Sequence, residues 1–136
     1  MRVDLDALCT VQETEFRELY LIAHGASKEY TIWAVNPGGV TVRDRRGAVR
    51  GHFRSGIPTG TLDLMGFAHG DGLHIEFELK NANTVISPEQ TQRMLLLPKL
   101  GCVVAFYRID PTLTIRTNLE AAHQALLDAI AVRRSK

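Results

Sequence analysis

The sequence predicts a single α/β domain in which a central mixed β-sheet is flanked by helices. Helical periodicity alternates with β-rich segments along the chain, a glycine-rich turn joins two of these segments, and another follows a helix. Strands joined by a short turn are antiparallel, whereas a strand that returns after a helix usually lies parallel to an earlier one. The sheet is therefore mixed, and a chain of 136 residues, 45% of them hydrophobic, is expected to form one domain over residues 1–136.

Three segments have the apolar spacing of amphipathic helices. We expect these helices over about residues 11–24, 87–98 and 118–132. The second has the strongest start signal, because Ser87 can cap the helix, proline suits the next position and Gln90 completes a capping box. The last helix is expected to begin at a cap formed by Thr117 or Asn118. Its stripe of alanine and leucine could pack on the core or against a second subunit.

Strand-like segments separate these helices. We expect strands over residues 31–35, 62–67, 73–80 and 102–107, and a basic hairpin or loop over residues 40–54. Segment 73–80 alternates between apolar and polar residues, so its apolar side chains share one face and its polar side chains share the other. We expect His74 and Glu76, on the polar face, to be exposed. Trp33, in the first strand, is expected in the core.

Basic residues gather between the first two strands, although the formal net charge of the chain is only +1. Between residues 43 and 54 a single acid, Asp44, accompanies five arginines: Arg43, Arg45, Arg46, Arg50 and Arg54. Contacts of such a cluster with DNA phosphates are favourable because they release counterions, whereas a solvated basic loop is the simpler alternative. Asn36, in the preceding Asn-Pro-Gly-Gly turn, could line the same cleft, although turn chemistry alone explains an asparagine there.

The cysteines and the N-terminal segment indicate in which cellular compartment the protein is expected. Cys9 and Cys102 are far apart and in no metal-ligand spacing, so we expect reduced thiols rather than a disulfide or a zinc site. Acids stand near the N-terminus where a signal peptide needs a basic start and an apolar run. No apolar stretch approaches the ~18 residues that span a membrane. These features favour a cytoplasmic protein.

The residues with chemical potential lie on the two arms of the hairpin expected over residues 62–80. A hairpin of this length brings Asp63 near the far end of the second arm, where Glu78 and Lys80 share a face. Two carboxylates with a main-chain carbonyl form an oxygen-rich site that suits Mg²⁺ or Mn²⁺. A lysine beside them can orient or deprotonate a water and stabilise charge on a phosphate. From spacing alone, a solvated strand face with cross-strand charge pairs is the commoner explanation.

In this region the sequence resembles the VRR-NUC nucleases of phages and of replication and repair proteins, within the PD-(D/E)xK, restriction-endonuclease-like superfamily. The match covers about residues 11–108 and keeps the order of the family's motifs. The matching segments are Trp33-Ala34-Val35-Asn36 with Gly38, Gly60-Thr61-Leu62-Asp63-Leu64-Met65-Gly66, Phe77-Glu78-Leu79-Lys80, Ser87-Pro88-Glu89-Gln90 and Gly101-Cys102-Val103-Val104. Leu62 stands where the family usually has proline, and Thr84 stands where a glycine is expected.

The resemblance implies roles for particular residues. Asp63, Glu78 and the carbonyl of Leu79 would bind the metal, and Lys80 would assist the attacking water. Gln90 would point from the start of its helix into the site. An acid on the first helix often completes the site, and Glu13 is the first choice because Phe16 and Tyr20 follow it at the family's spacing, with Glu15 as the competitor.

The function that the resemblance implies is a Mg²⁺-dependent deoxyribonuclease, with Mn²⁺ as a substitute. It would hydrolyse phosphodiester bonds as an endonuclease rather than an exonuclease, on structured or branched DNA. A homodimer is expected, because two sites are needed to cut two strands, in the cytoplasm of a bacterium or a phage-infected host. Two alternatives remain: a non-cleaving DNA-binding module of the same fold in a replication, repair or restriction system, and a structural domain whose charged strand face has no chemistry.

Overall fold

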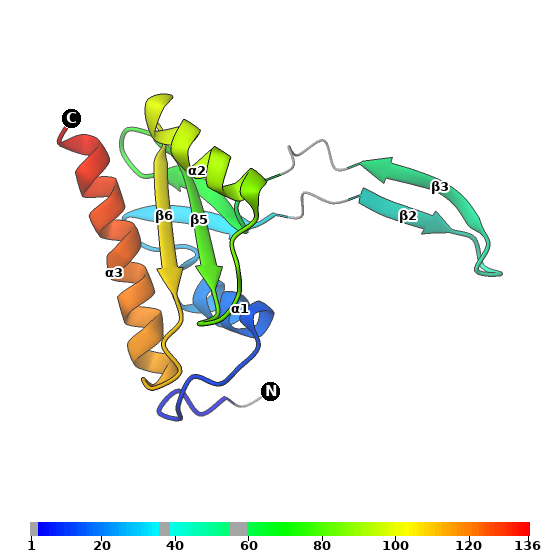
Figure 1. Cartoon of the computed structure of the whole chain (residues 1–136), viewed down its shortest axis with the longest axis horizontal. Helices are drawn as coiled ribbons and strands as arrows, with labels where there is room; N and C mark the ends of the chain where they lie inside the picture. The colour runs from blue at the N-terminus through cyan, green and yellow to red at the C-terminus, as the bar shows by residue number, and fades with distance from the viewer. Residues whose placement is uncertain (1–2, 36–38, 55–59) are drawn as a thin grey trace.

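The computed structural model describes residues 3–35, 39–54 and 60–136 (Figure 1). Its helices are α1 (Glu13–His24), α2 (Pro88–Lys99) and α3 (Ile115–Arg134). Its strands are β1 (Tyr30–Ala34), β2 (Gly39–Arg43), β3 (Val49–Arg54), β4 (Leu64–Ala68), β5 (His74–Lys80) and β6 (Val103–Arg108). The α/β class predicted from the sequence is therefore confirmed. None of the described helices is both long and apolar enough to cross a membrane.

Four strands form the central sheet in the order β1-β4-β5-β6. β4 pairs antiparallel with both β1 and β5, whereas β6 lies parallel to β5 after the crossover through α2. The predicted mixed sheet is thus confirmed. Gly66 in β4 lies directly against β1, where an added Cβ would overlap the carbonyl oxygen of Thr31. Any larger residue at this position would force the two strands apart.

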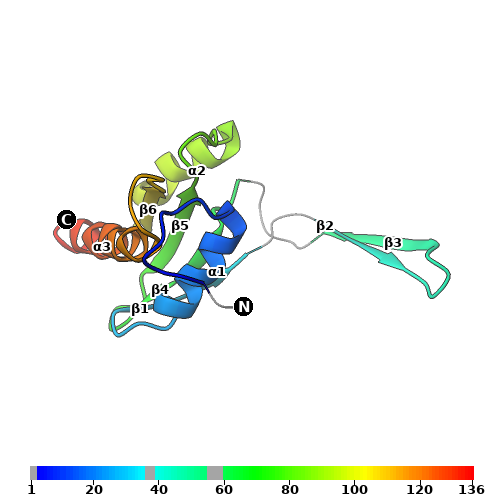
Figure 2. The ribbon, with the colours of Figure 1, turned by 90° about the horizontal axis from the view of Figure 1, so that it is seen from below.

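The two faces of β5 are covered by different helices, and Figure 2 shows α1 and α2 on opposite sides of the sheet. On one face Phe77 packs edge-on against Tyr20 of α1, in a core that also includes the buried residues of α3. On the other face α2 covers Glu76 and Glu78, which are both fully buried. The expectation that Glu76 would be exposed is therefore wrong, because α2 lies over the polar face. His74, at the start of β5, is half-buried.

Helix α3 begins earlier than the sequence predicted. Its cap is Thr114, whose hydroxyl accepts the N–H of Thr117 at 3.1 Å, so caps at Thr117 or Asn118 are wrong. Asn118 is instead buried, and its amide bonds the carbonyls of Asp110 and Thr114 at 2.9 Å each, which ties α3 to the end of β6. The apolar stripe of α3 packs on the core through Ile115, Leu119, Ala122, Leu126 and Ile130.

Trp33 is 44% exposed, so its predicted place in the core is wrong. It alternates with the buried Ile32 along β1 and therefore points to the opposite face of the sheet. β1 is an edge strand at the far side of the sheet from β6, and helix α2 packs against β6 and reaches β5 through Gln90 and Arg93. The indole ring of Trp33 instead lies near the ring of Phe67 on the neighbouring strand.

Strands β2 and β3 form a separate two-stranded ribbon, which we call the arm (residues 39–54). Their antiparallel register runs from Gly39 paired with Arg54 to Arg43 paired with Val49, with a bulge between Val42 and Arg43. Figures 1 and 2 show the arm projecting away from the central sheet. Of the hairpin and the loop that the sequence left open for residues 40–54, the structure has the hairpin. The predicted turn that contains Asn36 lies outside the described residues.

Candidate active site

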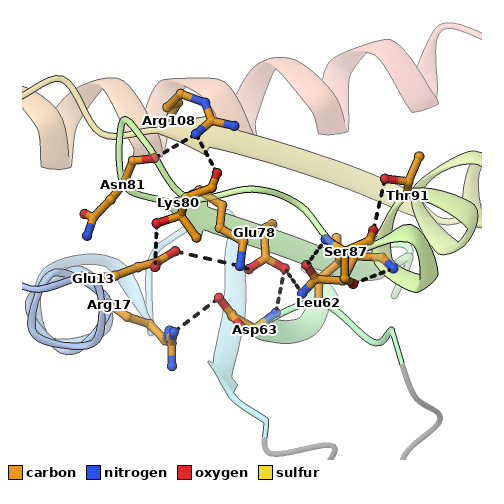
Figure 3. A network of polar contacts seen from close by, with 12 residues as sticks. Glu13, Arg17, Leu62, Asp63, Glu78, Lys80, Asn81, Ser87, Thr91 and Arg108 are labelled. Atoms are coloured by element: carbon orange, nitrogen blue, oxygen red, sulfur yellow. Dashed lines mark hydrogen bonds and ion pairs between the residues drawn. The ribbon is translucent and has the colours of Figure 1, made fainter.

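The C-terminal end of β5 lies where β4 and β5 separate (Figure 3). Their register ends at Leu64 and Phe77, whereas β5 continues beside β6. Asp63, the residue before β4, therefore directs its N–H to the side chain of Glu78, 3.4 Å from Oε2. The carbonyl of Asp63 accepts the N–H of Val35 at 2.9 Å. Both backbone groups of Asp63 are engaged, so its place beside Glu78 is defined.

Helix α2 places Gln90 against the carboxylate of Glu78. The capping box predicted from the sequence is present: Gln90 N–H donates to Ser87 Oγ at 3.1 Å, and Ser87 N–H donates to Gln90 Oε1 at 3.4 Å. Because the cap holds the amide oxygen of Gln90, the Nε2 atom of the same side chain points away from the cap and toward β5. That nitrogen donates to Glu78 Oε2 at 2.8 Å. The start of α2 and the end of β5 are thereby joined at the site, as the resemblance implied.

Lys80 lies between two carboxylates. Its Nζ is 3.5 Å from Glu78 Oε1 and 3.9 Å from Glu13 Oε1. Both of these oxygens are buried, and neither accepts a hydrogen bond from any described residue. Glu13 therefore faces the site, whereas Glu15 makes no hydrogen bond or ion pair there among the described residues. Two positions along a helix turn a side chain to another face, so the geometry favours Glu13 over Glu15.

Arg17 is a site residue that the sequence analysis missed. Its guanidinium donates to Asp63 Oδ2 at 3.2 Å, and both side chains are about four-fifths buried. Arg17 follows Glu13 by four residues, so the two side chains lie on one face of α1. That spacing was a signal in the sequence, but no pattern in the sequence indicated an arginine beside Asp63.

Glu76 forms a second buried cluster beside the first. Arg93, one helical turn after Gln90, binds it with two hydrogen bonds, from Nε to Oε1 at 2.7 Å and from a terminal nitrogen to Oε2 at 2.6 Å. His74 Nε2 lies 2.8 Å from Oε2, and the Leu62 N–H donates to Oε1 at 3.2 Å. The backbone N–H groups of two consecutive residues, Leu62 and Asp63, thus donate to the two buried carboxyl groups of β5, Glu76 and Glu78. Proline at position 62 could not make this contact.

Thr84, the other departure from the resembling pattern, also contacts the site. Its hydroxyl donates to Glu13 Oε2 at 3.4 Å. Arg108, at the end of β6, holds the surrounding loop by donating to the carbonyls of Asn81 and Thr84 at 2.7 and 2.9 Å. The loop after β5 therefore orients Glu13 from the side opposite Lys80.

Two neighbouring carboxyls give the site unusual electrostatics. Burial, and then the adjacent Asp63 carboxylate, raise the pKa of Glu78 to about 9 against the opposing charge of Lys80. Burial also acts to raise the pKa of Glu76, but hydrogen bonds from Arg93 and His74 outweigh it and lower that pKa. The surroundings of Glu78 therefore favour its protonated form, whereas those of Glu76 favour the ionised form.

A divalent cation fits the donor set at Glu78. Hard cations such as Mg²⁺ and Mn²⁺ prefer carboxylate and carbonyl oxygens, and a cation replaces the proton that like charges force onto a carboxyl. The two buried oxygens that accept no hydrogen bond, on Glu13 and Glu78, are suitable ligands. Within the described residues no three histidine, cysteine, aspartate or glutamate side chains form a ready-made metal cluster. Arg17 engages Oδ2 of Asp63, so it would compete with a metal for that oxygen.

The structure brings together Glu13, Asp63, Glu78, Lys80 and Gln90, with Leu79 between two of them on β5. It does not bring the predicted basic residues to this cluster. Arg43, Arg45, Arg46 and Arg50 lie on the arm, away from the carboxylates (Figure 1). Asn36 and the side chain of Arg54 lie outside the described residues.

Comparison of the chain with known proteins gives no family assignment, because no family model and no curated protein matches it. The site is therefore interpreted from its own geometry and from the resemblance of its motifs.

Proposed function

We propose that this chain is a metal-dependent nuclease of the restriction-endonuclease-like type, related to the VRR-NUC nucleases, that hydrolyses phosphodiester bonds in DNA. The observation that carries the proposal is the convergence of Asp63, Glu78, Lys80 and Gln90 where β4 and β5 separate. A solvated strand face would leave these side chains exposed, but Glu78 is fully buried and Lys80 is largely buried.

Asp63, Glu78 and the Leu79 carbonyl, with Glu13, would hold Mg²⁺ or Mn²⁺. A metal held there supplies an acidified water and polarises a phosphoryl oxygen. Gln90 binds one oxygen of Glu78 and leaves Oε1 for a ligand. The Lys80 ammonium is placed to hold the attacking water and to stabilise the charge that grows on the phosphate. Arg17, once separated from Asp63, would be free to contact the phosphate.

The test is cleavage of plasmid, linear duplex and four-way-junction DNA with Mg²⁺ or Mn²⁺, followed on gels. We expect metal-dependent internal cleavage by the wild type and a loss of at least about a hundredfold in Lys80→Ala. Lys99→Ala is the matched control, because Lys99 is exposed at the far end of α2. Equal cleavage by the wild type and Lys80→Ala would contradict the proposed mechanism.

A second candidate function is a DNA-binding module of the same fold that does not cut. The observation that favours it is that Arg17 and Lys80 already lie against the carboxyl groups of Asp63, Glu13 and Glu78. This candidate predicts salt-sensitive DNA binding, no calorimetric signal for Mn²⁺ and no cleavage of any of the three substrates. Mn²⁺ binding that is lost in Asp63→Asn would exclude it.

We also propose that the nuclease acts as a homodimer, which would supply one site for each strand. Its support is the outer surface of α2, where Leu95, Leu96 and Leu100 are 66%, 49% and 66% exposed. Exposed apolar side chains gathered on one helix are typical of protein interfaces. Sedimentation of the wild type beside Leu95→Lys/Leu100→Lys tests this, and an unchanged mass would contradict it.

A further inference from the structure

The arm is attached at both ends to the walls of the candidate site. Before the arm, β1 ends at Ala34, and the next residue, Val35, donates its N–H to the Asp63 carbonyl at 2.9 Å. After the arm, the chain returns at Gly60, where an added Cβ would lie only 2.7 Å from the backbone of Glu89 in α2. Gly60 also has a φ of 90°, which larger residues rarely adopt. The described chain on either side of the arm therefore lies at the edge of the site.

The tip of the arm has a defined conformation, although it is exposed. Asp44 Oδ1 accepts the N–H groups of Arg46 and Ala48 at 2.9 and 3.0 Å, and its Oδ2 pairs with Arg50 Nε at 3.1 Å. Gly47 closes the turn at a φ of 83°. A single aspartate thus organises the turn and neutralises one arginine.

The charges that remain at the tip are positive and directed to solvent. Arg45 and Arg46 are exposed, and neither side chain has a hydrogen bond or ion pair with another described residue. Arg43 is held across the turn by the Gly47 carbonyl at 3.0 Å, which leaves the rest of its guanidinium exposed. With Asp44 offset by Arg50, three arginine charges stay available to a polyanion.

The shape of the arm suits duplex DNA. An isolated two-stranded ribbon is only marginally stable in water, so a bound partner would stabilise it. The major groove admits such a ribbon, and phosphates line both of its edges. β2 has five residues, which at about 3.3 Å each span roughly 16 Å. Each strand of duplex DNA carries one phosphate per about 3.4 Å of helix axis, so this length corresponds to about five base pairs.

We propose that the arm holds duplex DNA that flanks the cleaved bond, with Arg43, Arg45 and Arg46 on its phosphates. The substrate is therefore a DNA with at least about five base pairs of duplex on the arm side of the site. DNA that ends or becomes single-stranded within that distance loses these contacts. The part of this inference that concerns the cleaved bond rests on the proposed function, whereas duplex binding by the arm does not.

The experiment measures binding by fluorescence anisotropy in EDTA, so that no metal-dependent cleavage occurs. Labelled duplexes range from about six to about twenty-four base pairs, and affinity is followed against salt concentration. The variants are Arg45→Ala/Arg46→Ala and a control of equal charge, Lys28→Ala/Lys99→Ala, whose lysines are exposed and lie outside the arm. Mn²⁺ calorimetry of each variant reports whether the carboxylate site is intact.

We expect the arm variant to bind long duplexes at least about tenfold more weakly than wild type at 0.1 M salt. The slope of log affinity against log salt should fall by about 1.8, since each lost phosphate contact removes about 0.9. The control variant should keep the wild-type slope. The affinities of the arm variant and of the wild type should differ least on the shortest duplex.

The outcomes separate this inference from the proposed function. Metal-dependent cleavage together with unchanged binding by the arm variant would overturn the inference alone. Arm-dependent duplex binding without cleavage would support the inference and leave the non-cleaving module as the function. A change in sedimentation rather than in DNA affinity would identify the arm as a contact between two copies of the chain and would overturn the inference.

Discussion

Glu76 and Glu78 are two fully buried carboxyls on the same face of β5, yet their surroundings differ in kind. Glu76 receives two hydrogen bonds from Arg93, one from His74 and one from the Leu62 N–H, and its pKa is lowered although burial opposes this. Glu78 keeps one oxygen without a hydrogen bond, and its pKa is raised to about 9. A shift of two residues along a strand therefore separates a fully paired carboxylate from an incompletely paired one.

This difference indicates what each carboxylate does. A buried ion pair with every lone pair satisfied holds elements together, in this case α2, β5 and the chain before β4. A buried carboxyl that lacks partners is costly and persists where a ligand completes it.

The largest effect is expected for Glu78→Gln, which keeps the shape of the side chain but removes its charge. We expect cleavage to fall by about a thousandfold or more, equivalent to about 4 kcal/mol, because a metal ligand is lost. In EDTA the same variant should unfold at a higher temperature than wild type. A raised folded-state pKa means that ionised Glu78 destabilises the fold progressively as pH rises from about 4.5 toward about 9.

Cleavage assays and thermal unfolding in EDTA at two pH values check this prediction. The stability difference between Glu78→Gln and wild type should be larger at pH 8 than at pH 6. A variant that is less stable than wild type at both values would contradict the assignment of Glu78 as an incompletely paired carboxyl.

Arg93→Met is expected to have the next largest effect, on stability. It leaves the charge of Glu76 buried without its main partner, which typically costs about 3–5 kcal/mol. The melting temperature should fall by roughly 10–20 °C. The double variant Arg93→Met/Glu76→Met should recover most of this loss, because a well-packed apolar pair can replace a buried ion pair. Equal losses in the single and double variants would show that the ion pair is not the cause.

Metal affinity should depend on pH because Glu78 must lose its proton to bind a cation. With the pKa raised to about 9, affinity for Mn²⁺ should rise about tenfold per pH unit below that value, or about a hundredfold from pH 6 to pH 8. Calorimetry in buffers of different ionisation enthalpy should show release of about one proton per ion at pH 7. Binding that is independent of pH, without proton release, would rule out Glu78 as a ligand.

The smallest effect is expected for Arg17→Ala. Arg17 competes with a metal for Asp63, so its removal should strengthen Mn²⁺ binding by a fewfold, in line with the modest energies of partly exposed ion pairs. Arg116→Ala is the control, since it removes a similar pair with Asp6 on another part of the surface. Weaker Mn²⁺ binding by Arg17→Ala would show that Arg17 supports Asp63 rather than competing for it.

Much of the local structure was predictable because its signals are local. Ser87 and Gln90 form a capping box that needs only four consecutive residues, and alternation along 73–80 predicted β5 together with the shared face of Glu78 and Lys80. The hairpin turn predicted that Asp63 would lie near them. Burial was harder to predict, since alternation cannot reveal whether a helix covers the polar face, so Glu76 and Trp33 were assigned wrongly.

The sequence by itself determined the α/β class, the mixed sheet and the grouping of Asp63, Glu78, Lys80 and Gln90. The class, the sheet and the grouping of Asp63, Glu78 and Lys80 depend on side-chain periodicity and short turns, which act over a few residues, whereas the place of Gln90 was implied by the resemblance of the motifs. Only the tertiary structure decided that α2 covers the polar face of β5, that Arg93 pairs with Glu76, and that α1 brings Arg17 to Asp63 and favours Glu13 over Glu15. Those contacts join residues far apart in the chain, and they follow from how whole helices pack on the sheet, which no local pattern specifies.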